Sequence, residues 1–192
     1  PIVAAAHLIS SLYMFVPRRT DSQDSVVLTV GKITGADTAN AIPEWIELRG
    51  TVRTLDREVR ERTIAHIRQL AEGIAQTSDT TIDVDFGVGS GSIRNDARLI
   101  GLLRTACQDV LGADGIEEIP RPSMGSEDFA YYLEHVPGAM FRLGCASSRV
   151  GGSPLHSPTF DVDDEALRIG ARIMASRTIE WFSPEYQLTN ES

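Results

Sequence analysis

The sequence has few cysteines, a deficit of basic residues and no long apolar run. Of its 192 residues, 2 are cysteine, 18 are Lys or Arg and 27 are Asp or Glu, which gives a formal net charge of −9. A chain this acidic repels polyphosphate and anionic lipid, so nucleic acid and membrane surfaces are poor partners for it. No run of about 18 apolar residues occurs, which excludes a membrane-spanning helix. We expect a globular protein of one or two domains in the cytoplasm.

Several common functional motifs are also absent. The sequence contains no P-loop, no dinucleotide-binding glycine motif after a strand, no H-E-x-x-H and no C-x-x-C, which excludes the commonest nucleotide, zinc-protease and redox sites. Cys107 and Cys145 lie far apart in apolar segments, as is typical of reduced, buried thiols; one long-range disulfide is the alternative.

Apolar spacing predicts two regions that meet near residue 90. The first has the order helix, strand, strand, helix, strand, at residues 1–16, 26–33, 45–54, 57–74 and 80–86. This order is the split-βαβ pattern without its first strand, which is central in that sheet. In the second region, helices at 96–111, 127–135 and 164–182 alternate with short strands at 116–119 and 139–144, which is typical of α/β packing. We therefore predict domains at 1–89 and 90–192, each with an incomplete sheet.

Among the four histidines, His156 differs from the others by its setting. His7, His66 and His135 fall in predicted helices, where a surface or core-edge imidazole is the simplest interpretation. His156 lies in a loop with prolines on both sides, where it could be a metal ligand or an acid/base group. Its spacing alone still favours an ordinary loop histidine, because a zinc-type site needs three or four ligands and no others stand nearby.

Four polar residues are further candidates. Glu127 and Asp128 stand at a predicted helix start, where the helix dipole stabilises carboxylates; alternatively they orient a metal-bound histidine. Asn40 lies in a loop and Arg53 on the polar face of a strand. An amide and a guanidinium could together bind a carboxylate or an oxyanion, although a solvated strand face also accounts for Arg53.

Four segments resemble one family in order and spacing: Asn40–Pro43 (NAIP), Gly50–Asp56 (GTVRTLD), Met124–Ala130 (MGSEDFA) and Leu155–Pro158 (LHSP). The family is that of the metal-dependent amidohydrolases and peptidases, which contains hippurate hydrolase, N-acyl-amino-acid deacylases and auxin-conjugate hydrolases. The resemblance covers almost the whole chain. It implies a ferredoxin-like split-βαβ lid or dimerisation domain lacking its first strand, followed by the C-terminal part of an α/β two-metal hydrolase domain.

The resemblance also implies roles for single residues. His156 matches a ligand of a site that holds two divalent metal ions and activates water to attack an amide carbonyl. Asn40 and Arg53 match lid positions that contact the substrate carboxylate or the oxyanion, in their own or a partner subunit. Glu127 and Asp128 match a supporting acidic motif. The substrate would be an N-acyl amino acid or a related small amide, and the lid would form a homodimer.

Other family residues have no counterpart in the sequence: the remaining metal ligands, the paired glutamates that include the general base, and a lid histidine. We therefore expect the chain to be the C-terminal portion of such an enzyme and to be inactive alone. The alternative is a non-catalytic binding or dimerisation module, since the strand at 26–33 should be a sheet edge, and edges pair readily with a second copy.

Overall fold

The computed structural model describes residues 1–35, 37–87 and 89–182, and the chain divides into two compact units. The first contains Pro1–Ser92 and Ser123–Tyr131, and the second contains Ile93–Pro122 and Tyr132–Ser192. The expected division at residue 90 lies close to the first change of unit, but the segment 123–131 groups with the first unit. The expected second domain also includes residues 183–192, which lie outside the described residues.

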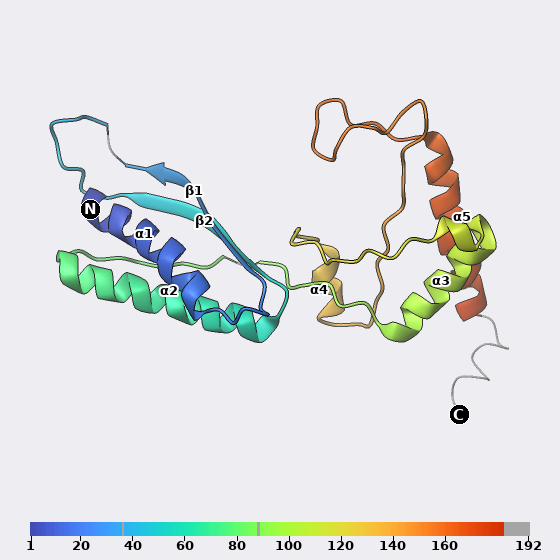
Figure 1. Ribbon diagram of the computed structural model, residues 1–192, viewed down its shortest axis with the longest axis horizontal. Helices are drawn as coiled ribbons and strands as arrows, with labels where there is room; N and C mark the ends of the chain where they lie inside the picture. The colour runs from blue at the N-terminus through green and yellow to red at the C-terminus, as the bar shows by residue number, and fades with distance from the viewer. Residues whose placement is uncertain (36, 88, 183–192) are drawn as a thin grey trace. The chain divides into compact units, whose positions relative to one another are not determined.

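The first unit is built from two helices and a β-hairpin. Its elements are α1 (Ile2–Arg19), β1 (Val26–Thr34), β2 (Glu47–Thr54) and α2 (Arg57–Ser78). The strands pair antiparallel, and Gly31 is the extra residue of a bulge between Val30 and Lys32. Figure 1 shows α1 and α2 side by side against this hairpin. The expected first helix was to end near Val16, but α1 continues through Pro17, because a proline in the last turn removes only one helical hydrogen bond.

Helical spacing on both helices produces the core of this unit. The buried side chains recur every three or four residues, namely Ala4, Leu8, Leu12 and Val16 on α1 and Ile67, Ala71 and Ile74 on α2. Alternate strand residues pack against them, namely Val26, Leu28 and Val30 of β1 and Leu48 and Val52 of β2. Each large aliphatic side chain removed from water contributes about 1.5–3 kcal/mol. Because Leu48 and Val52 face this core, the opposite, polar face of β2 remains exposed, as its sequence alternation predicted.

The expected strand at 80–86 is extended but pairs with no strand among the described residues. Ile82, Val84 and Phe86 pack against the core while the residues between them are exposed. The period of two was therefore recognised correctly, and the assignment as a strand was wrong. A strand also requires a neighbouring backbone to accept its hydrogen bonds, and side-chain alternation does not report on that neighbour.

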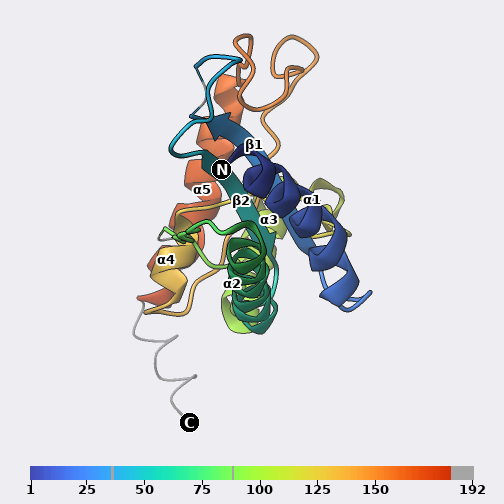
Figure 2. The same cartoon turned by 90° about the vertical axis from the view of Figure 1, so that its left-hand side faces the viewer.

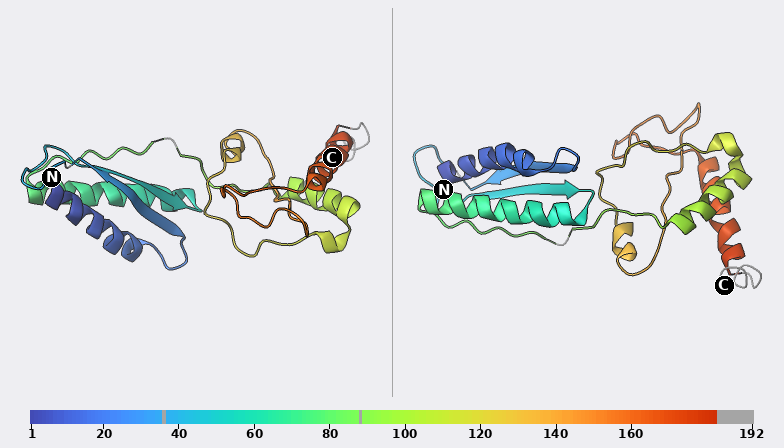
Figure 3. Two further views of the ribbon diagram at one scale, coloured as in Figure 1. Left: turned by 90° about the horizontal axis from the view of Figure 1, so that it is seen from above. Right: turned by 60° about the horizontal axis from the view of Figure 1, so that its bottom comes forward.

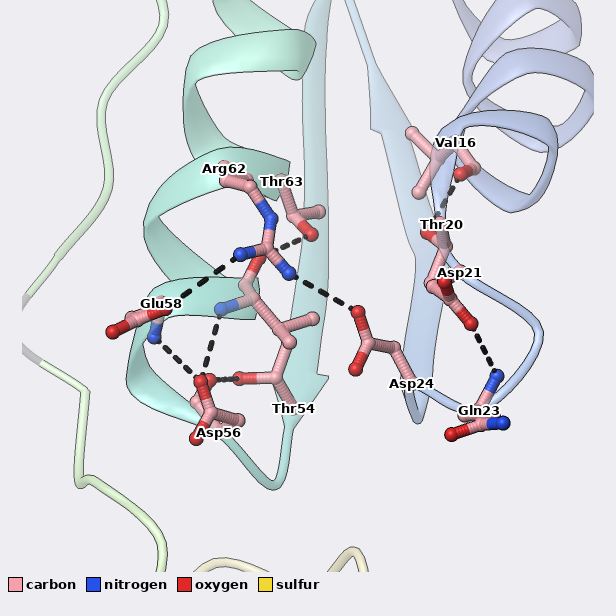
Figure 4. A network of polar contacts seen from close by, with 11 residues as sticks. Val16, Thr20, Asp21, Gln23, Asp24, Thr54, Asp56, Glu58, Arg62 and Thr63 are labelled. Carbon is pink, nitrogen blue, oxygen red and sulfur yellow. Dashed lines mark hydrogen bonds and ion pairs between the residues drawn. The ribbon is translucent and has the colours of Figure 1, made fainter.

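Helix α2 begins at a side-chain cap. The Asp56 carboxylate accepts hydrogen bonds from the N–H groups of Glu58 and Val59, at 2.8 and 3.3 Å. Figure 4 shows the first of these two bonds. Arg62, one turn further along, forms a 3.1 Å ion pair with Asp24, which precedes β1. The start of α2 is thereby fixed beside the hairpin.

The second unit contains α3 (Ala97–Leu111), a short 3-10 helix η1 (Ala113–Gly115) and α5 (Asp164–Trp181). Helices α3 and α5 pack together, with Ala106 and Ile173 fully buried, and lie against each other in both views of Figure 3. A further short helix, α4 (Phe129–Leu133), stands at the change of unit.

Two expected strands of the second region, 116–119 and 139–144, do not form within the described residues. The second segment is instead held by a side chain: the Asn95 amide donates to the Met140 carbonyl at 2.9 Å and accepts from its N–H at 2.8 Å. The helix expected at 127–135 is also shorter than predicted, since only Phe129–Leu133 of this segment is helical. Apolar runs this short do not specify whether a backbone partner is present. No described helix is long and apolar enough to cross a membrane.

Candidate functional site

Arg53 lies on the exposed face of β2 and contacts a segment distant in sequence. Its Nη1 donates a 2.7 Å hydrogen bond to the carbonyl oxygen of Met124. Met124 begins the acidic motif that the sequence analysis singled out, and both residues belong to the first unit. The structure therefore brings the strand motif and the acidic motif together.

A second contact joins the same segment to the end of the glycine- and serine-rich stretch. The hydroxyl groups of Ser90 and Ser126 lie 2.7 Å apart. Arg60 of α2 approaches the neighbouring residue, with Nη1 3.4 Å from the Gly89 carbonyl oxygen. A Cβ atom on Gly89 would lie 2.9 Å from Nη2 of Arg60, so the flexible end of that side chain would have to shift slightly if residue 89 had a side chain.

Asn40 and Arg53 are not brought together within one chain. Arg53 pairs with Val27 at one end of the hairpin, whereas Asn40 lies in the loop beyond the Thr34–Glu47 pair at the other end. The six residue-to-residue steps from Glu47 to Arg53 span about 20 Å at about 3.3 Å per step. One chain therefore cannot apply both side chains to a single carboxylate or oxyanion.

Glu127 and Asp128 are exposed on the turn that leads into α4. Their backbone carbonyls accept hydrogen bonds from Ala130 and Tyr131, each at 3.1 Å, which forms the first turn of that helix. Ala130 is buried and so fixes the turn from its inner side. The sequence predicted that this pair stands at a helix start, and the structure places it immediately before Phe129, the first residue of α4.

His156 is exposed and has a backbone φ of 65°, the left-handed region that few residues other than glycine adopt. It occupies the third position of a four-residue turn, which the Ser157 N–H closes by a 3.2 Å bond to the Pro154 carbonyl. The Thr159 hydroxyl lies 2.9 Å from those of both Ser153 and Ser157. The imidazole is thus presented to solvent by a loop with its own polar network.

The base of this loop is closed by the segment that starts α5. The Asp163 N–H donates to the Cys145 carbonyl at 2.9 Å, and the Asp163 carboxylate accepts from the Glu165 N–H at 2.9 Å. The Glu165 N–H, and after it the Ser147 hydroxyl, lower the pKa of the Asp163 carboxyl. The carboxylate form is therefore the one that suits this helix start.

The described residues do not complete a metal site. Within 1–35, 37–87 and 89–182, no group of three or more His, Cys, Asp or Glu side chains is placed to hold an ion. His156 can supply one ligand, which is fewer than the three protein ligands that a catalytic zinc site takes. Cys107 and Cys145 are free, half-buried thiols, and burial raises the pKa of Cys107.

Residues 6–179 match the sequence pattern of peptidase family M20/M25/M40. The chain belongs to this family. The match confirms the resemblance that the four motifs indicated.

Two relatives are similar to this chain along most of its length. A probable hydrolase of Synechocystis is 37% identical over 167 residues, which are 86% of this chain and 42% of that protein. N-acetyl-L-cysteine deacetylase of Bacillus subtilis is 36% identical over 168 residues, which are 87% of this chain and 38% of that protein. The chain thus spans less than half the length of these relatives.

Two solved structures superpose on most of the chain. A crystal structure described as an aminohydrolase of methicillin-resistant Staphylococcus aureus superposes with a TM-score of 0.81 at 26% identity, covering 95% of this chain and 46% of that one. A Bacillus subtilis protein described as a dinuclear metal-binding peptidase of the M20 family gives a TM-score of 0.70 at 28% identity, covering 91% and 44%. These neighbours confirm a mixed α/β fold and support divalent metal binding in the family.

Sequence reasoning did not find three features: the Arg53 contact with the Met124 carbonyl, the Ser90–Ser126 contact, and the hydroxyl cluster around Thr159. The first two contacts join residues separated by 71 and 36 positions, and a backbone carbonyl carries no sequence signal. Thr159 lies three residues after His156, and the cluster of hydroxyl residues around it was the available signal.

Proposed function

We propose that this chain is part of a metal-dependent amidohydrolase that hydrolyses the amide bond of N-acyl amino acids or related small amides. The observation that carries the proposal is the M20 match over residues 6–179, together with 36% identity to a protein named N-acetyl-L-cysteine deacetylase. A bound metal ion would supply the activated water for this reaction. The chain's 42% share of its Synechocystis relative supports assigning it to a longer protein.

In this proposal the first unit is a ferredoxin-like split-βαβ lid and dimerisation domain, and the second unit is the C-terminal part of the catalytic domain. The alternating burial of 80–86 supports the lid assignment, because these residues offer an extended backbone to a central strand. A backbone in this conformation can pair without rearranging the core beneath it.

Each candidate side chain then has a separate task. His156 serves as one metal ligand, and its exposed position in a closed turn leaves a ring nitrogen accessible. Arg53 binds the carboxylate of the substrate through paired hydrogen bonds, and Asn40 donates its amide to the oxyanion. Because the hairpin separates these two, they act on different groups or in different subunits. Glu127 and Asp128 support the site without touching the reacting atoms.

The test compares this chain with the longer chain that the proposal expects the same reading frame to encode. Each is assayed with Mn²⁺, Co²⁺ or Zn²⁺ on N-acetyl-L-cysteine and hippurate, by detecting the released amino acid. We expect turnover by the longer chain and none by the 192 residues. Turnover by the short chain would refute its inactivity, and an inert longer chain would refute the amidohydrolase assignment.

A matched pair of variants tests the metal ligand in the longer chain. His156→Ala should weaken metal retention after dialysis, measured by elemental analysis, whereas His135→Ala should leave it unchanged. Both imidazoles are exposed in the second unit, so loss of retention in both would indicate a general effect on folding. Equal metal content in His156→Ala and the parent would refute the assignment.

The second candidate function is a dimerisation module without catalysis. The specific observation is that β1 belongs to a two-stranded sheet and exposes Val27 and Ile33, while α1 exposes Met14 and Phe15. Within the described residues the outer edge of β1 pairs with no further strand, and such an edge with apolar neighbours is suited to adding a second copy. Sedimentation equilibrium should then show a dimer, and a monomer at every concentration tested would exclude it.

A further inference from the structure

We propose that Arg53 is a positioning residue, which fixes the segment Ser123–Asp128 on the first unit by holding the carbonyl of Met124. The inference extends the proposed function, because it gives Arg53 a partner in the protein besides a substrate carboxylate. The contact itself requires neither substrate nor metal, so it can be tested separately from catalysis.

The strand that carries Arg53 is rigidly held. Within β2, Arg53 pairs with Val27, and its neighbour Val52 packs into the core. The 2.7 Å separation between Nη1 and the Met124 oxygen is short for a nitrogen–oxygen hydrogen bond, as expected when the donor carries a charge. A planar guanidinium on a fixed strand therefore defines where this carbonyl lies.

The segment has few other constraints of its own. Ser123 accepts a local bond from the Gly125 N–H at 3.1 Å, and Gly125 through Asp128 are exposed. The Ser90–Ser126 contact at 2.7 Å provides a second attachment point, and Arg60 holds the adjoining Gly89. These two anchors, at Met124 and Ser126 on either side of the exposed Gly125, suffice to set the position of the Glu127–Asp128 pair that follows.

The chemistry of the guanidinium allows Arg53 to serve two partners together. It carries five N–H donors in a rigid fork, and the bond to Met124 uses one of them. A carboxylate that approaches from another edge of the fork can be bound while the carbonyl stays in place. Arg53 would thereby place the substrate's anionic group next to the Ser123–Asp128 segment. A lysine at this position retains the charge but lacks the fork.

Methyl NMR of methionine reports whether Met124 is held in place in the 192-residue chain. The four methionines, labelled with ¹³C at their methyl groups, give few signals, and Met124→Leu identifies the one of interest. The test variant is Arg53→Gln and the matched control is Arg49→Gln. Arg49 lies on the same exposed strand face, but its ion pair is with Glu47 of the same strand.

We expect the Met124 methyl signal in Arg53→Gln to sharpen and shift toward the position of an unstructured methionine. In Arg49→Gln it should stay at the parent position, and in Arg53→Lys it should lie between the two. Met14, on α1 of the same unit, reports whether the fold is intact. An unchanged Met124 signal in Arg53→Gln, with Met14 also unchanged, would overturn the proposal.

If Arg53→Gln does not fold, Arg53→Lys decides the question, because it keeps the aliphatic stem and the charge. A shifted Met124 signal with an unchanged Met14 signal then supports the proposal, and no shift of Met124 overturns it. Since no substrate is present, failure of this test leaves the amidohydrolase assay unaffected, and an inert enzyme leaves this test unaffected.

Discussion

Substitutions of His156 should separate backbone strain from any role of the imidazole. At φ 65° a residue with a Cβ atom is strained by about 1–2 kcal/mol, whereas glycine is not. The exposed imidazole contributes little packing, so the backbone decides the outcome. We expect the free energy of unfolding of His156→Gly to equal or exceed that of the parent. That of His156→Ala should lie about 1 kcal/mol below the value for His156→Gly, and that of His156→Val about 2 kcal/mol below it.

The assay uses the two tryptophans as separate reporters. Trp45 lies in the first unit and Trp181 in the second, so a Trp45→Phe background leaves one fluorophore that reports urea unfolding of the second unit. At a slope of about 1–2 kcal/mol per M of urea, a difference of about 1 kcal/mol moves the midpoint by about 0.5–1 M.

The control is the same series at His135, which is exposed in the same unit and has no positive φ. There glycine should give no advantage over alanine, because glycine only adds entropy to the unfolded chain. Coincident midpoints for His156→Gly and His156→Val would refute the reasoning, since they would mean that the turn does not impose the left-handed backbone in solution.

Three further predictions concern the first unit, with Trp45 as the reporter of unfolding. Gly50→Ala should destabilise this unit by at least about 2 kcal/mol, because the new Cβ would lie 2.2 Å from the Thr29 oxygen. Gly73→Ala, in open space on α2, should stabilise it by about 0.5–1 kcal/mol. Equal unfolding midpoints for the two variants would contradict this prediction. Asp56→Ala should cost about 1 kcal/mol through loss of the α2 cap, and Asp56→Asn much less; equal losses would argue against capping. Burial, and then the charge of Arg19, lower the pKa of His66, so the unfolded state binds more protons and stability should fall as pH drops below about 6.5; His66→Gln should reduce this dependence.

The local elements were predictable where local chemistry suffices. The cap of α2, the apolar stripes of α1 and α2 and the alternation in β2 all follow from residue types at fixed spacing, and the structure confirms them. The three expected strands at 80–86, 116–119 and 139–144 were wrong for one common reason. A strand exists only where another backbone pairs with it, and that partner is not encoded in the strand's own residues.

The candidate site shows the same division. Residue types and spacing in the sequence by themselves determined the family, the exposed polar face that carries Arg53, and the loop that carries His156. Tertiary structure alone decided that Arg53 meets the Met124 carbonyl, that Asn40 lies at the far end of the hairpin, and that His156 has a left-handed backbone. The physical reason is that chemistry belongs to each residue, whereas contacts between residues 71 positions apart depend on how the whole chain packs.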